Sequence, residues 1–125
     1  SQEETKTQQT EPLDIQKGTT LKTVRSELYN QIQNNPIEAA QTCNEIDSIV
    51  EKDICFRTVA ELSNSSNFCE YVETQLSKDS CYMKFVINNN ELEHCDNIED
   101  SYLKDSCENI KKIKELEEKY LALQE

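Results

Sequence analysis

The chain has 125 residues, of which 25 are acidic and 13 basic, and its net charge is −12. This length allows one domain with a modest core. The acidity argues against nucleic acid and anionic membranes as partners, because both are bound by clustered Lys and Arg. One Gly and two Pro argue against a turn-rich β protein, so we expect an all-α chain. No stretch reaches the ~18 apolar residues of a transmembrane helix.

Residues 1–17 are polar and contain only Leu13 and Ile15 as large apolar residues. Such a segment cannot bury enough surface to fold, so the sequence predicts a disordered tether at 1–17, followed by a helical domain over 18–125. A polar leader suits a protein that is held at a surface, with a possible lipid anchor upstream of residue 1. An ordinary frayed terminus is the alternative interpretation.

The first predicted helix spans about 20–33. Thr20 can cap its start, and apolar residues then recur at spacings of three and four, at Leu21, Val24, Leu28 and Ile32. This helix occupies the place of the second helix of a preceding repeat but lacks its cysteines. We therefore expect an N-terminal cap helix.

A 26-residue repeat follows. The six cysteines are separated by 12, 14, 12, 14 and 12 residues, and the units begin at Cys43, Cys69 and Cys95. Each unit matches C-x-x-[IV]-x5-K-D-x-C, and the units cover about 43–68, 69–94 and 95–120. Internal repeats of this period indicate stacked supersecondary units. The sequence predicts a short α-solenoid.

Each unit is predicted to be a helical hairpin. Asn35 with Pro36, Asn67 and the run 88–90 precede first helices at about 36–46, 68–73 and 91–99. Second helices are predicted at about 49–62, 75–87 and 101–123, the first of them opened by a capping box of Ser48 and Glu51. The last is lengthened by Ile110, Ile113, Leu116, Tyr120 and Leu123. This longer C-terminal helix closes the stack, or else provides a seam for a partner helix or for a homo-oligomer.

The cysteines lie at equal distances from the bend of each hairpin, which favours disulfides 43–55, 69–81 and 95–107. The competing pattern, 55–69 and 81–95, leaves Cys43 and Cys107 without a near partner. Each bond would add roughly 3 kcal/mol in the chain-entropy model. Metal and redox sites use closer cysteine pairs than these, so we expect no metal and no cofactor. Because disulfides persist in oxidising compartments, we expect an extracytoplasmic location: periplasm, cell surface or secreted.

Few residues suggest chemistry. With every thiol oxidised no cysteine nucleophile remains, and one Gly cannot form a phosphate loop, so we expect no enzyme. The Lys-Asp pair recurs in each unit and is interpreted as scaffold, with each Asp near a neighbouring Lys. The alternative is an acidic interaction surface that includes Asp53, Asp79 and Asp105, together with His94, the only histidine.

The units resemble, in general plan, the helical-hairpin repeats of the tetratricopeptide and Sel1-like class. The C-x-x-I-x5-K-D-x-C-[FY] unit is similar to cysteine-bearing repeats of predicted secreted or lipid-anchored prokaryotic proteins. The resemblance covers residues 43–108 and implies no activity. The function expected is a non-enzymatic interaction module that presents an acidic helical surface to a basic protein. The alternatives are an inhibitor or immunity-type protein that blocks a basic enzyme, and a structural subunit of a filament or surface layer.

Overall fold

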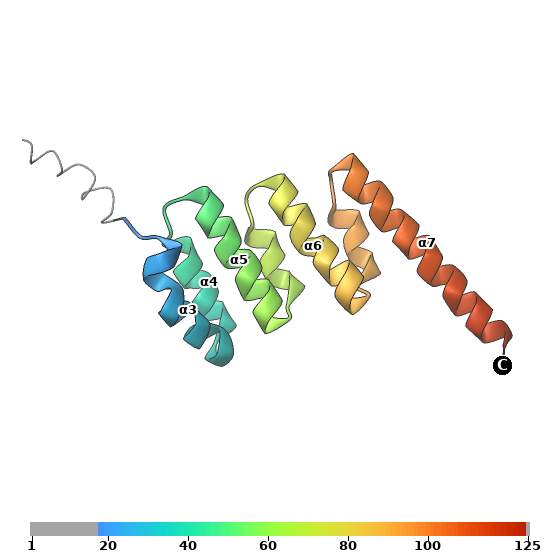
Figure 1. Ribbon diagram of the computed structural model, residues 1–125, viewed down its shortest axis with the longest axis horizontal. Helices are drawn as coiled ribbons and strands as arrows, with labels where there is room; N and C mark the ends of the chain where they lie inside the picture. Colours follow the sequence, from blue (N-terminus) through green and yellow to red (C-terminus); the bar gives the residue numbers. More distant parts are fainter. Residues whose placement is uncertain (1–17, 125) are drawn as a thin grey trace, which may run out of the picture.

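The computed structural model describes residues 18–124, and within them all regular structure is helical (Figure 1). The all-α prediction is therefore confirmed for this part of the chain, while the predicted tether at 1–17 lies outside the described residues. The helices are α3 (Leu21–Asn34), α4 (Pro36–Asn44), α5 (Ile49–Ser63), η1 (Ser66–Tyr71), α6 (Gln75–Asn89), η2 (Leu92–Asn97) and α7 (Ser101–Leu123). Over residues 18–124, none combines the length and hydrophobicity that crossing a bilayer requires.

Helix α3 forms where it was predicted. The Thr20 hydroxyl accepts a hydrogen bond from the Thr23 amide, and the Thr23 hydroxyl accepts one from the Thr20 amide. Val24, Leu28 and Ile32 then face inward on one side and are buried, as the spacing of three and four requires. This face packs against α4 and α5, so α3 covers the first cysteine-bearing pair.

The three cysteine-bearing units form three helical pairs, α4 with α5, η1 with α6 and η2 with α7, which lie side by side (Figure 1). Their first arms differ. Asn35 caps α4 and Pro36 occupies its first turn, which favours an α-helix. The helices η1 and η2 are six-residue 3-10 helices without a side-chain cap, because these segments are too short to form several α-helical hydrogen bonds.

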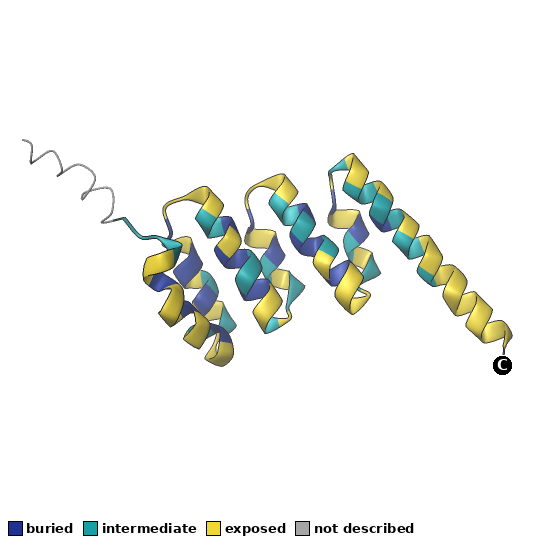
Figure 2. Cartoon of the chain, viewed as in Figure 1, coloured by how far each residue is buried: buried dark blue, intermediate teal, exposed yellow. Residues whose placement is uncertain are grey.

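All three disulfides follow the predicted pairing, Cys43–Cys55, Cys69–Cys81 and Cys95–Cys107, with Cα–Cα distances of 5.6, 5.7 and 5.5 Å. Each bond joins the first arm of a pair to the second, and all six cysteines are buried. The cysteines belong to two groups of buried residues, and the half-buried Phe68 packs against both groups. Figure 2 shows these buried stretches along the inner sides of α5 and α6.

Asparagine decides where the second arms end. Asn64 and Asn90 adopt left-handed backbone conformations, with φ of 57° and 62°, directly after α5 and α6. Asn is one of the few residues that tolerates this conformation. The corresponding residue of the third unit, 26 positions after Asn90, is Leu116. Leu116 continues the helix, and α7 runs on to Leu123 with its distal half exposed (Figure 2).

Candidate functional site

Two of the four residues predicted to form an interaction surface are buried. Asp53 is 2 % exposed and Asp79 is fully buried. The Asp53 carboxylate accepts hydrogen bonds from the Glu73 and Thr74 amides at 2.8 and 3.1 Å. The prediction that these two aspartates offer contacts to a partner is wrong, because they bind the free amides that open the next second arm.

Asp79 repeats this contact one unit later, accepting from the Glu99 and Asp100 amides at 3.2 and 2.8 Å. The side chain amide of Gln75 is a third donor, at 2.8 Å. At the N-terminal end, Glu51 accepts from the Leu21 amide at 2.8 Å. The Glu51 side chain therefore bonds to α3. In the predicted capping box it would instead accept from the Ser48 amide. Asp105, the third member of the series, is exposed.

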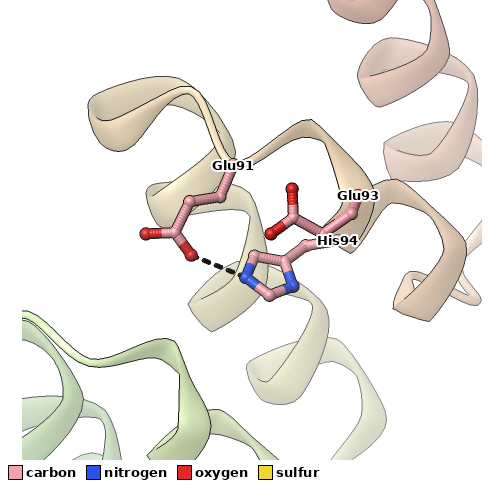
Figure 3. A group of neighbouring side chains, drawn as sticks. All are labelled: Glu91, Glu93 and His94. Carbon is pink, nitrogen blue, oxygen red and sulfur yellow. Dashed lines mark hydrogen bonds and ion pairs between the residues drawn. The ribbon is translucent and has the colours of Figure 1, made fainter.

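His94 lies between two units (Figure 3). Its Nε2 atom is 2.8 Å from Glu91 Oε1 and 2.9 Å from Ser66 Oγ, and its ring packs on Tyr82 with centroids 5.1 Å apart. Burial raises the pKa of Glu91, but hydrogen bonds from Asn89, His94 and Ser66 outweigh this and leave that pKa below its ordinary value. His94 is only 15 % exposed at its side chain, so it connects neighbouring units more than it offers surface.

The same cluster contains candidate metal ligands. Glu91, Glu93 and His94 can each offer one ligand atom, and these atoms lie within 4.8 Å of one another. The Nε2 atom of His94 and both carboxylate oxygens of Glu91 are already within hydrogen-bonding distance of protein groups. A metal would have to break this network, so the arrangement favours a structural connection over a metal site.

An apolar groove opens between the first and second units. Its lining comes from α4, α5 and η1, and consists of Ile37, Ala40, Gln41, Asn44, Phe56, Phe68 and Tyr71. Ile37 is 66 % and Tyr71 56 % exposed, although both are large and apolar. The Tyr71 ring packs on the buried Phe56 ring with centroids 5.5 Å apart. The groove thus has the buried Phe56 at its floor and the exposed side chains of Ile37 and Tyr71 at its rim.

A second groove, here called the acidic groove, lies one unit further along and overlaps the equivalent place. It is lined by Glu70, Gln75, Lys78, Tyr82, Asp96, Asn97 and Glu99. Glu70, Tyr82 and Asn97 follow Asn44, Phe56 and Tyr71 of the apolar groove by 26 residues. The second groove contains three carboxylates and one lysine. Burial, with a further contribution from Glu70, raises the pKa of Tyr82.

No protein-family model, curated protein or solved structure matches the chain. The apolar groove and the acidic groove are therefore described from their own residues. Sequence reasoning did not identify them. Comparing the units could have done so, since Tyr71 stands where the other units have Glu45 and Asn97. Among these three equivalent positions, only Tyr71 is an exposed aromatic residue.

Proposed function

We propose that this chain is a non-enzymatic protein-interaction module, in which the apolar and acidic grooves together bind a segment of a basic protein. The main support is that the two grooves lie one unit apart, with three of their seven lining positions related by the 26-residue repeat. A bulky apolar side chain suits Ile37 and Tyr71, and a Lys or Arg one unit further along suits the carboxylates. Aromatic anchors beside complementary charge are typical of protein interfaces.

Charge and rigidity both support this proposal. The net charge of −12 attracts a basic partner over distances near the Debye length and raises its association rate. The grooves lie between units that disulfides close internally and that Asp53 and Asp79 connect to their neighbours. A surface held in this way loses little conformational entropy on binding.

The proposed architecture is a short α-solenoid of three repeats. The equivalent roles of Asp53 and Asp79, each accepting amides 20 and 21 residues further along, support stacking with one repeating geometry. Three disulfides favour an oxidising extracytoplasmic location, such as the periplasm, the cell surface or the exterior. A lipid anchor upstream of residue 1 is part of the same proposal.

The case for a non-enzymatic role depends on the side chains that catalysis usually employs. All six cysteines form disulfides, and the one histidine of the sequence is engaged by Glu91 and Ser66. Neither cysteine nor histidine is thus free to serve as nucleophile or base. The proposed binding role requires no cofactor.

Panning a library of linear peptides on the immobilised, oxidised protein tests this function. The enriched peptides are expected to combine a bulky apolar residue with a nearby Lys or Arg, and to bind less tightly as salt is raised. The double variant Tyr71→Ser/Glu99→Gln should weaken them at least about tenfold. The matched variant Tyr29→Ser/Glu118→Gln changes an exposed tyrosine and glutamate outside both grooves and should retain binding. Equal binding by the two variants would refute the groove assignment.

The inhibitor or immunity-type role is the second candidate. The acidic groove favours it because its carboxylates would also attract a basic enzyme. A basic extracytoplasmic enzyme captured through Glu70 and Glu99 would be blocked if the contact covers its active site. Assaying the captured enzyme with and without this chain separates the two roles. Full activity in the complex identifies an adaptor, and loss of activity identifies an inhibitor.

A further inference from the structure

The distal half of α7 carries an apolar stripe that its own hairpin does not cover. The stripe consists of Ile113, Leu116, Tyr120 and Leu123, which are 54, 64, 63 and 86 % exposed. Cys107 and Ile110, by contrast, face the η2 and α6 side and belong to or pack against the second core group. At 100° per residue the stripe lies about 130° around the helix from that inner side. A second helix can therefore approach the stripe without meeting the hairpins.

The spacing of the stripe is three, four and three residues, which is the a and d pattern of a coiled coil. Ile113 and Tyr120 take a positions, and Leu116 and Leu123 take d positions. In a parallel coiled coil, a β-branched residue at a with Leu at d favours two strands, and Ile113 provides that residue at one of the two a positions. In this register Lys112 takes position g and Glu117 position e.

The flanking charges select both partner and orientation. In a parallel pair of identical helices, position g of each faces position e of the other five residues further on, so Lys112 of each copy faces Glu117 of the other. An antiparallel pair brings g to g and places like charges together. Lys119 then faces the neutral Gln124 in the parallel pair, which adds no repulsion.

The charge of this segment also permits two acidic chains to meet here. Residues 109–125 contain four lysines and four glutamates, so they contribute nothing to the net charge of −12. The remaining 108 residues carry all of it and would repel a second copy. Association is thus least opposed at the distal half of α7.

We propose that the distal half of α7 pairs in parallel with the same segment of a second copy. The stripe is short, so the dimer forms reversibly and depends on concentration. Each dimer presents two sets of the apolar and acidic grooves on one stem. Two grooves on one stem would bind a clustered or repeated partner with a higher effective concentration than a single chain.

Sedimentation equilibrium of the oxidised protein over a roughly hundredfold concentration range tests the pairing. The mass is expected to rise from monomer towards dimer. Leu116→Asp should weaken association at least about tenfold, while Leu62→Asp, at a leucine of similar exposure on α5, should leave it unchanged. Glu117→Lys should weaken it several-fold through repulsion by Lys112, and Lys112→Glu/Glu117→Lys should restore it. A monomer at every concentration would overturn the proposal.

Orientation needs its own measurement. A pyrene attached at Gln124→Cys is expected to give excimer fluorescence that grows with dimer formation, since a parallel pair brings both labels together. The same label at Tyr29→Cys on α3 provides the control and should give none. Dimers without excimer emission at residue 124 would show an antiparallel pair and contradict the charge argument.

Discussion

Asp79 provides the sharpest test of how the units are joined. Its buried carboxylate accepts two backbone amides of the next unit and the side chain amide of Gln75. Asp79→Asn keeps one acceptor oxygen but places an amino group against a backbone N–H, so one hydrogen bond to a charged acceptor is lost. Such bonds contribute about 1.5–3 kcal/mol each. We expect the free energy of unfolding to fall by about 2–3 kcal/mol.

Asp105→Asn is the matched control. It lies at the same position of the third unit, removes the same charge, and is exposed. Its effect should remain within about 0.5 kcal/mol. Urea unfolding of both variants with the disulfides intact, followed by circular dichroism, measures the difference. Equal losses in the two variants would refute the claim that these carboxylates act by holding the next unit.

Three further predictions concern the cluster around His94, the second disulfide and the end of α7. Glu91→Gln should destabilise the protein near neutral pH. Because the folded pKa of Glu91 is lowered, its contribution to the free energy of unfolding is complete above its ordinary pKa and is lost as pH falls through the folded pKa. The urea midpoints of the two proteins should therefore converge in acid, and a constant gap between them would contradict this. Replacing Cys69 and Cys81 by Ala should cost about 3 kcal/mol of unfolding free energy in the same assay, and a negligible loss would show that the hairpin does not need its bond. Leu116→Asn should restore the residue that ends α5 and α6, and should reduce helix content by circular dichroism, whereas unchanged helicity would mean that Asn is not the stop signal.

The repeat made most of the fold predictable. Because the cysteine spacing alternates regularly, it placed the bends, the arms and all three disulfide pairs. Thr20, Asn35 and Ser48 cap their helices as the local sequence indicates, although Glu51 does not complete the predicted capping box with Ser48. These features depend on short-range geometry, which a sequence displays directly.

The relation between units was not predictable in the same way. The Lys-Asp pair suggested a contact between Asp and a neighbouring Lys, yet Asp53 and Asp79 bind backbone amides 20 and 21 residues away. Every residue except proline has a backbone N–H, so the residue type does not indicate which amide will donate to a distant carboxylate. The 3-10 form of η1 and η2 was also not predicted, because a segment of six residues shows too little periodicity to distinguish a 3-10 helix from an α-helix.

The residues of the two grooves were not predicted. An acidic surface was expected, but the residues chosen for it were the repeated aspartates, two of which are structural. The two grooves share three repeat-related positions and differ in character where the units differ, above all at Tyr71. The repeated residues Asp53 and Asp79 thus connect units, whereas the proposed binding residue Tyr71 lies where the units differ.

Every surface proposed for this chain depends on the hairpins, and their disulfide pattern can be measured directly. Mass spectrometry of peptides cut under non-reducing conditions should find the links 43–55, 69–81 and 95–107 and no free thiol. This result would support the stacked hairpins, with both grooves and the exposed stripe of α7. Links 55–69 and 81–95, or free thiols at Cys43 and Cys107, would contradict the account.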